Sequence, residues 1–203
     1  METNNCPNCG DSLPAAFNAA KMCTCPSCDT TLVLDGAHLQ NAGTSGQMHD
    51  FPTLLKLGQS IHIKGHDYQV LGHVRFDYGR GWWDEFWVEG TDHRVWISVD
   101  EGDVILQRPI PRNDCPANTK PPKLGDTVTA ERRNYRVTEA SSAICIAVRG
   151  HFSEILKIGS QYDYVNCTGE NGNLLSGEFS EGAPDWYLGA WLDPFEFTVG
   201  IEK

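Results

Sequence analysis

Two short cysteine motifs near the N-terminus constrain the fold of this 203-residue chain more than any other feature. They are Cys6-Pro7-Asn8-Cys9 and Cys25-Pro26-Ser27-Cys28, and fifteen residues separate them. This spacing is typical of structural zinc sites that combine two C-x2-C turns. Two such turns that face each other supply four thiolates at about 2.3 Å from one tetrahedral ion. The sequence therefore predicts a zinc ribbon over residues 1–35 with one structural Zn²⁺. The predicted ligands are Cys6, Cys9, Cys25 and Cys28.

A fifth cysteine, Cys23, lies two residues before Cys25 and is an alternative ligand. The prolines that follow Cys6 and Cys25 make the two motifs alike, which favours Cys25 and leaves Cys23 outside the site. A closed four-thiolate site has no open position for water. We therefore expect the metal to stabilise the ribbon and not to catalyse a reaction.

The N-terminal residues show neither the basic nor the apolar region of a secretory signal, so we expect a cytoplasmic protein. In a reducing compartment clustered cysteines bind metal more often than they form disulfides. No apolar run approaches the roughly 20 residues that a membrane-spanning helix needs, so we expect no membrane span.

The charge balance disfavours nucleic acid as a partner. The chain has 16 Lys and Arg against 27 Asp and Glu, a formal net charge of −11. Residues 1–50, which contain the predicted ribbon, have a single basic side chain, Lys21. Because phosphate binding requires basic side chains, we expect a protein partner for the ribbon and no nucleic acid.

The rest of the chain contains two similar segments. Lys56-Leu57-Gly58, followed by Tyr68 and Val70, recurs 67 residues later as Lys123-Leu124-Gly125, followed by Tyr135 and Val137. We infer an internal duplication, the alternative being two unrelated hairpins of similar pattern. Short alternating segments separated by turn residues predict antiparallel strands in both segments.

These patterns predict an all-β protein in which the N-terminal zinc ribbon is followed by two small antiparallel β-barrels of SH3-like type. Residues 36–53 are rich in Gly, Asn, Ser and Gln and predict a linker. Five prolines predict a second linker over residues 109–122. The predicted barrels are residues 54–108 and 123–203.

The segment Trp82–Trp87 is the most distinctive part of the first predicted barrel. On a strand, Trp83, Glu85 and Trp87 share one face, while Trp82, Asp84, Phe86 and Val88 share the other. Because Trp82, Phe86 and Val88 make the second face the more apolar one, we predict that it is core and that Trp83, Glu85 and Trp87 bind a partner. The alternative is that both faces are packed.

An enzyme is the alternative function. It would be a hydrolase that uses His73, Asp84 or Glu85 in a polar site between the two β domains. A deep polar pocket with perturbed titratable groups would favour this interpretation.

Four motifs occur together in this sequence: the C-P-x-C-G motif, the pattern from Leu57 to Gly72, the strand from Trp83 to Phe86, and Trp186-Tyr187-Leu188-Gly189. In this combination the chain resembles an uncharacterised bacterial family catalogued as a domain of unknown function, in which a zinc ribbon precedes L-G…Y-x-V and W-x-E β-domain repeats. The sequence departs from the family at Val95-Trp96-Ile97-Ser98, where a Trp-Leu pair is more usual. The resemblance implies an accessory or adaptor role in a membrane-associated or stress-related system. It supplies no catalytic residues.

Overall fold

The computed structural model describes residues 5–15, 17, 20–35, 38–48 and 52–199, and its strands form one antiparallel sheet. The all-β prediction is therefore confirmed. The strands are β1 (Met22–Thr24), β2 (Thr30–Asp35), β3 (His38–Thr44), β4 (Ser60–Ile63), β5 (His66–Asp77), β6 (Trp82–Glu89), β7 (Arg94–Asp100), β8 (Asp103–Pro109), β9 (Thr127–Ala130), β10 (Arg133–Phe152), β11 (Gln161–Gly169), β12 (Leu174–Phe179), β13 (Asp185–Leu192) and β14 (Phe197–Val199). Short 3-10 turns are η2 (Arg112–Asp114), η3 (Glu170–Gly172) and η4 (Pro194–Glu196).

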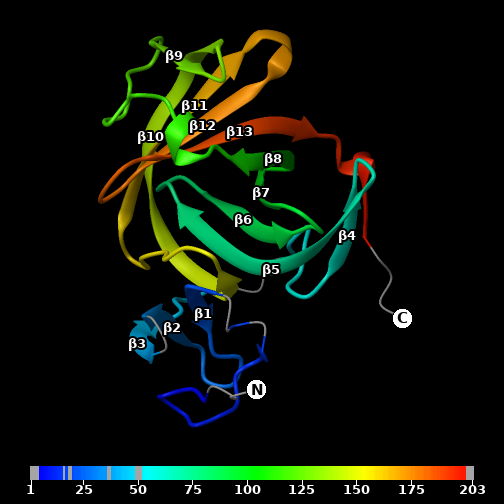
Figure 1. Cartoon of the computed structure of the whole chain (residues 1–203), viewed down its shortest axis with the longest axis vertical. Coiled ribbons are helices and arrows are strands. Elements are labelled where there is room, and N and C mark those ends of the chain that lie inside the picture. Colours follow the sequence, from blue (N-terminus) through cyan, green and yellow to red (C-terminus); the bar gives the residue numbers. More distant parts are fainter. Residues whose placement is uncertain (1–4, 16, 18–19, 36–37, 49–51, 200–203) are drawn as a thin grey trace.

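Eight of the described strands form a ring, in the order β5-β6-β7-β8-β13-β12-β11-β10 and back to β5 (Figure 1). Two strand pairs join the N-terminal half of the ring to the C-terminal half. Val74 of β5 pairs with Val148 of β10, and Arg108 of β8 pairs with Leu188 of β13. The ring is therefore built from both halves of the sequence.

Each half begins with the same hairpin, as the offset of 67 residues predicts. β4 pairs with the start of β5, and β9 pairs with the start of β10. The backbone N–H of Gly58 donates to Val70 at 2.9 Å, and that of Gly125 donates to Val137 at the same distance. Both glycines have left-handed φ angles, 76° and 87°, a backbone conformation that residues other than glycine rarely adopt. The strands that follow, β6-β7-β8 and β11-β12-β13, also pair in the same order.

The halves are not the two separate barrels that we expected from the sequence. Each has a small apolar core, which contains Tyr68 and Phe86 in one half and Tyr135 and Trp186 in the other. Yet Leu192, from the second half, packs in the first core, and β14 pairs with β4. An unpaired strand edge leaves backbone N–H and C=O groups without partners. Here the edge strands of one half form backbone hydrogen bonds with the edge strands of the other, and the two halves therefore make one sheet.

From Ile110 onward the proline-rich segment lies outside the strands, but the second half holds it in place. Arg112 donates hydrogen bonds to the carbonyl oxygens of Ala183 at 3.0 Å and Pro184 at 2.9 Å, and it forms an ion pair with Asp185 at 2.8 Å. Ile110 is buried in the core of the second half. The segment is thus anchored along part of its length.

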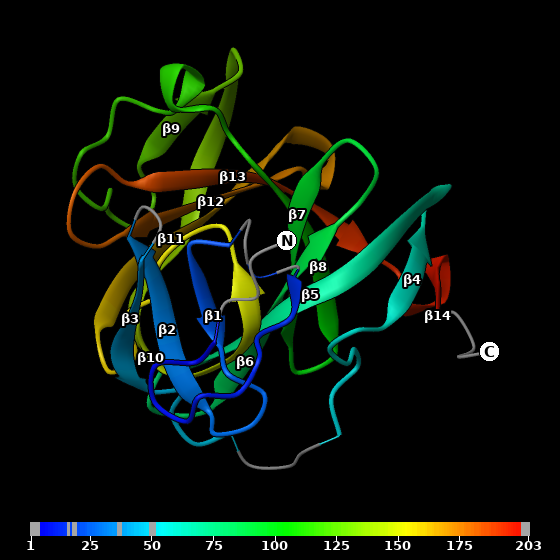
Figure 2. The same cartoon turned by 60° about the horizontal axis from the view of Figure 1, so that its bottom comes forward.

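The four cysteines and β1–β3 form a unit, here called the ribbon, that extends the sheet (Figure 2). Met22 and Cys23 of β1 pair with Phe152 and His151 of β10. Where the sequence predicts a linker over 36–53, residues 38–44 form β3, while residues 36–37 and 49–51 lie outside the described part of the chain. No helix in the described ranges has the length and apolar character needed to span a membrane.

Candidate metal centre and acidic cavity

The four predicted ligands converge at the end of the ribbon. The Sγ atoms of Cys6, Cys9, Cys25 and Cys28 all lie within 4.8 Å of one another. Cys6 and Cys28 are 3.8 Å apart, as are Cys9 and Cys25. A tetrahedron with metal–sulfur bonds of about 2.3 Å separates its sulfurs by about 3.8 Å. The four side chains therefore suit one metal ion, which is consistent with a zinc ribbon.

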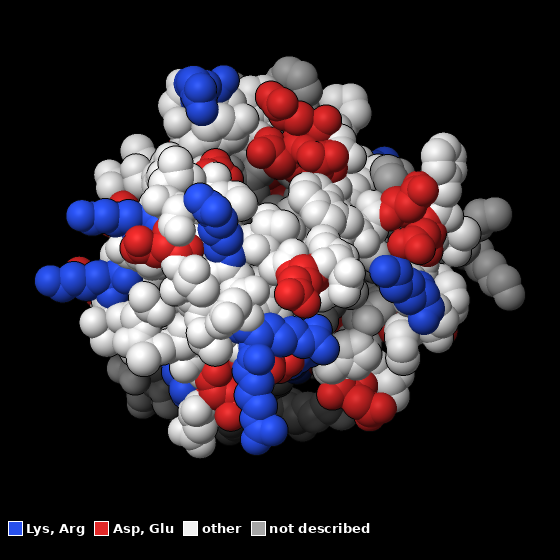
Figure 3. Space-filling model, turned by 90° about the horizontal axis from the view of Figure 1, so that it is seen from above, with Lys and Arg blue, Asp and Glu red and all other residues white. Residues whose placement is uncertain are grey.

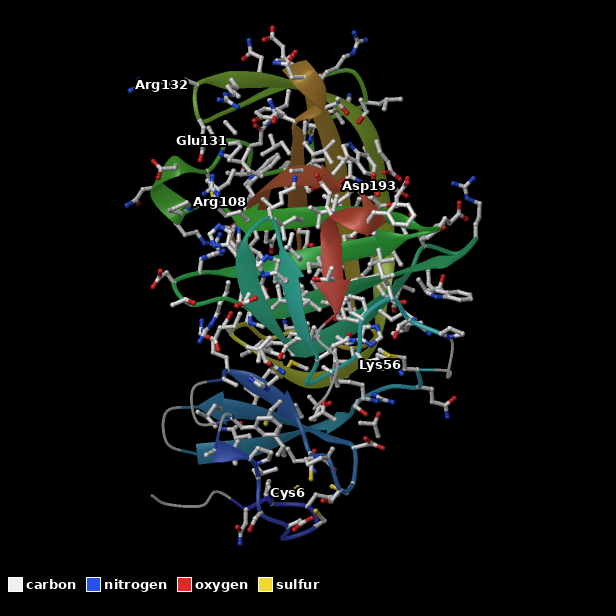
Figure 4. All side chains as sticks on the ribbon, turned by 90° about the vertical axis from the view of Figure 1, so that its right-hand side faces the viewer. Cys6, Lys56, Arg108, Glu131, Arg132 and Asp193 are labelled. Atoms are coloured by element: carbon white, nitrogen blue, oxygen red, sulfur yellow. The ribbon has the colours of Figure 1, made fainter. Side chains whose placement is uncertain are left out.

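The two C-P-x-C turns have the same backbone structure, which explains why the thiols converge. Gly10 N–H donates to Cys6 O at 2.8 Å, and Asp29 N–H donates to Cys25 O at 3.0 Å. Gly10 and Asp29 occupy equivalent positions and both have left-handed φ angles, 80° and 56°. Figure 4 shows Cys6 among other sulfur atoms, at the end of the molecule opposite Arg132.

Cys23 is not part of this cluster, in agreement with the assignment made from the prolines. It is buried on β1 beside β10, and its sulfur is not among the four that meet. Burial raises the pKa of its thiol to about 12. Cys23 is a core residue of the ribbon.

The face predicted to bind a partner lies on the inner side of the ring. Trp87 is only 5% exposed and contacts Trp96 at a ring-centroid distance of 4.9 Å. Its prediction as a surface residue is wrong, because the second half of the chain covers this face of β6. Trp83 is half-buried and Glu85 is buried, and both line a cavity inside the ring.

The opposite face of β6 is core in part. Phe86 and Val88 are fully buried, as predicted. Trp82, at the start of the strand, is 42% exposed, and the guanidinium of Arg75 lies 5.4 Å from the centre of its ring. Trp82 is therefore a surface residue and not part of the predicted core.

The cavity inside the ring has a volume of about 100 Å³ and an acidic lining. Four carboxyl groups face it, and no Lys, Arg or His of the described chain is among its lining residues. Asp100 and Glu139 are exposed, whereas Glu85 is buried and Glu178 is half-buried, so the acidic lining extends from the surface into the ring. The four are Glu85, Asp100, Glu139 and Glu178.

Two cross-strand pairs place the inner carboxyl groups. Glu85 of β6 lies opposite Ser98 of β7, and Glu178 of β12 lies opposite Tyr164 of β11. Since β6-β7 and β11-β12 occupy equivalent places in the two halves, each half contributes one such pair with one glutamate. The ring thus brings together two carboxyl groups that lie far apart in the sequence.

The inner carboxyl groups are held in an environment that disfavours their charge. Burial, together with the nearby Glu154, raises the pKa of Glu85 to about 7, although a hydrogen bond from Trp83 opposes this shift. Burial and the charges of Glu85, Glu154 and Asp185 raise the pKa of Glu178 well above its usual value. Burial also raises the pKa of Glu154 to about 7. The environment therefore favours the protonated form of all three carboxyl groups.

A chain of hydrogen bonds crosses one wall of the cavity. Gln107 Nε2 donates to Ser176 Oγ at 3.5 Å, and Ser176 donates to Asn166 Oδ1 at 3.0 Å. Asn166 Nδ2 and the Tyr164 hydroxyl then donate to the two carboxylate oxygens of Glu139, at 2.8 and 3.1 Å. This wall orients Glu139 at the edge of the cavity.

The residues considered for a hydrolase do not form one site. His73 Nε2 lies 2.8 Å from Asp84 Oδ1, and Arg75 Nε donates to the same oxygen at 2.7 Å. His73 also stacks on Phe86, with ring centroids 4.4 Å apart. Glu85 projects from the opposite face of β6, into the ring. The structure therefore brings His73 and Asp84 together and separates both from Glu85.

Sequence reasoning missed most of the cavity. Ser98, Gln107 and Glu178 carry no motif, and they meet Glu85 only because the ring closes. One signal was present: polar residues alternate with apolar ones on β7 and β12, although both faces of these strands are covered.

The face shown in Figure 3 presents Lys and Arg side chains separated by Asp and Glu side chains. Basic groups on this face do not form a continuous patch.

Comparison with known proteins gives one match. No curated protein and no solved structure matches the chain. A family model, described as a domain of unknown function (DUF4178), matches residues 56–194, which span both halves of the ring and the proline-rich segment between them. Because the match covers more than half of the sequence, the chain belongs to the DUF4178 family.

Proposed function

We propose that this protein is a binding protein in which the ring cavity receives a ligand and a zinc ion stabilises the ribbon. The supporting observation is that Ser98 lines the cavity, is only 9% exposed and forms no hydrogen bond with another described residue. The Glu178 carboxyl, which lines the same cavity, accepts none from the described residues either. A ligand in the cavity would supply hydrogen-bond partners to both groups. Trp83 and Glu85, which we predicted as binding residues, line the same cavity.

In this proposal one structural Zn²⁺ per chain occupies the four-cysteine cluster. Thiolates are soft ligands that suit zinc, and four of them leave no position for a substrate. The ribbon core is small, so metal affinity supplies much of its folding free energy. Because β1 pairs with β10, zinc would also stabilise one border of the ring.

The accessory role implied by the family resemblance fits a binding protein. The chain would act as an adaptor in a bacterial membrane-associated or stress-related system, with a protein partner. Because Trp87 is buried, the part of β6 that a partner could contact is the beginning of the strand, at Trp82.

A hydrolase remains the second candidate, and one observation favours it. A pKa of about 7 suits Glu85 for general acid or base catalysis at neutral pH. Glu85 and Glu178 come from different halves, so the site would lie between the two β units. Such an enzyme would work through its carboxyl groups, because His73 and Asp84 lie on the other face of β6.

Native mass spectrometry of the full chain, purified from its own host, tests the proposed function. We expect a mass that exceeds that of the zinc-loaded chain by one small molecule. Ser98→Leu should fill the cavity and remove this adduct, whereas Ser60→Leu, the same change on an exposed strand, should retain it. Circular dichroism and zinc content show that each variant is folded. A wild-type chain without an adduct, or an adduct that Ser98→Leu retains, would contradict the proposal.

A further inference from the structure

We propose that the ligand of the ring cavity is a small organic cation that carries a primary ammonium group. This inference rests on the proposed function and names its ligand class. Its first support is charge: four carboxyl groups line the cavity, and none of its described lining residues is basic. Such a lining attracts cations and repels carboxylates and phosphates.

The second support is independent of charge. Ser98 is about nine-tenths buried, lines the cavity, and forms no hydrogen bond with any other described residue. The Glu178 carboxyl likewise accepts no hydrogen bond from the described residues. Glu85 accepts a hydrogen bond from Trp83 Nε1 at 3.1 Å, through Oε1. When Glu85 and Glu178 are ionised, the cavity therefore has acceptor oxygens that the described residues leave unpaired, and an ammonium group supplies three donors.

Aromatic rings provide a third feature that suits an organic cation. Trp83 and Tyr164 line the cavity and meet edge to face, with ring centroids 5.2 Å apart. Aromatic faces attract cations within about 6 Å of the ring centre, most strongly where water is excluded. Ile105 adds an apolar contact for the carbon chain of the ligand.

The spacing of the carboxyl groups argues against a bare metal ion as the ligand. A divalent metal ion in an oxygen site needs several ligand atoms at about 2–2.6 Å. Among the described residues, the four cysteines are the only group of three or more potential ligands close enough to share an ion. No three of the cavity carboxyl groups are close enough to share an ion, whereas an ammonium group can pair with one or two of them. A volume of about 100 Å³ suits a ligand of this size.

The protonation of the inner carboxyl groups is consistent with a cationic ligand. Burial raises the pKa of both Glu178 and Glu85, and neighbouring carboxyl groups, Glu154 among them, raise it further. Because burial disfavours a net negative charge here, an entering cation should displace a proton. Affinity for the cation should therefore increase as the pH rises from 6 to 8.

Isothermal titration of the zinc-loaded full chain tests this inference with three probes of similar size. They are n-butylammonium, the neutral n-butanol, and the anionic butyrate. We expect binding of n-butylammonium alone. Glu85→Gln and Glu178→Gln should each weaken it at least tenfold, while Glu170→Gln, on an exposed turn, should leave it unchanged. A rise in the melting temperature of the wild type with n-butylammonium, but not with n-butanol, gives a second measurement that needs no variant.

The outcomes distinguish the proposed cation site from the more general proposal that the cavity binds a ligand. Equal affinity of wild type, Glu85→Gln and Glu178→Gln for n-butylammonium would overturn the cation site. Binding of n-butanol or butyrate in its place would overturn it too, as would a native adduct whose mass identifies a neutral or anionic compound. Those results would leave the binding function standing if Ser98→Leu still removes the ligand. A chain that binds no probe and carries no native adduct contradicts both proposals.

Discussion

At the scale of single residues, Glu85 links the chemistry of the cavity to the stability of the protein. Its carboxyl group is buried and accepts a hydrogen bond from Trp83, yet burial keeps its pKa near 7. The unfolded chain has a pKa of about 4.5 at this group. The folded state thus binds a proton more tightly than the unfolded state does.

Stability should therefore fall as the pH rises through the interval from about 4.5 to about 7, and the loss should be complete above it. A shift of this size corresponds to about 3 kcal/mol at Glu85. Glu85→Gln, which cannot ionise, should reduce the pH dependence and raise the melting temperature at pH 8 relative to the wild type. Thermal melts at pH 5 and pH 8 measure this. Equal slopes in the two proteins would show that Glu85 does not couple protonation to folding.

The cysteines give a second prediction at this scale. Cys6→Ser, Cys9→Ser, Cys25→Ser and Cys28→Ser should each lower bound zinc well below one ion per chain, because each removes a corner of the tetrahedron. Cys23→Ser is the matched control, since Cys23 is buried nearby outside the cluster. Metal analysis of the purified variants measures the ratio. Zinc loss in Cys23→Ser with retention in Cys25→Ser would reverse the assignment.

The two sites differ in how far the sequence alone could predict them. The cysteines lie in two local turns that have the same backbone, so their spacing was sufficient. Glu178 and Ser98 meet Glu85 through strand pairing between distant parts of the chain. The residues within one strand do not indicate which distant strand it pairs with, and the acidic cavity was therefore not predicted.

At the scale of the element, β6 shows what alternation can and cannot establish. The prediction that Trp83, Glu85 and Trp87 share a face is confirmed by their common position inside the ring. Alternation does not say which face of a strand is covered. Both faces of β6 are covered here, one by the core of its own half and the other by the second half. The assignment of Trp87 to the surface failed for this reason.

Substitutions along β6 should follow this packing. Phe86→Ala should cost about 3–5 kcal/mol, as expected for the loss of a buried aromatic side chain. Trp87→Ala should cost a similar amount, since Trp87 packs against Trp96 inside the ring. Trp82→Ala should cost clearly less, because almost half of Trp82 is exposed. Urea denaturation of the three variants measures these differences, and a loss at Trp82 as large as that at Phe86 would contradict the packing described.

At the scale of the whole molecule, the duplication explains both the symmetry and the single sheet. Each half repeats one hairpin and three further strands, which the offset of 67 residues predicted in part. What the repeat could not show is that the edges of the halves pair with each other. The pairs β5–β10 and β8–β13 depend on free edges in both halves, and a pattern within one half contains no information about its partner.

Cutting the chain between the halves should therefore not separate them. A specific protease site inserted between Asn118 and Thr119 lies in the proline-rich segment, beyond the contacts of Arg112 and outside every strand. After cleavage the two fragments should elute together in size-exclusion chromatography. Four strand pairs, β5–β10, β8–β13, β4–β14 and β1–β10, still join them. An ion pair at 2.8 Å between Arg108 and Glu131 joins them as well (Figure 4).

The same cleaved protein should unfold in a single transition, because neither half keeps a closed sheet without the other. Tryptophan fluorescence follows this unfolding well, since Trp87 and Trp96 lie in the core that the halves share. The uncut protein with the inserted site is the control for the effect of the insertion itself. Fragments that separate under native conditions, or two well-resolved transitions in urea, would instead indicate two independent barrels, as the linker composition alone had suggested.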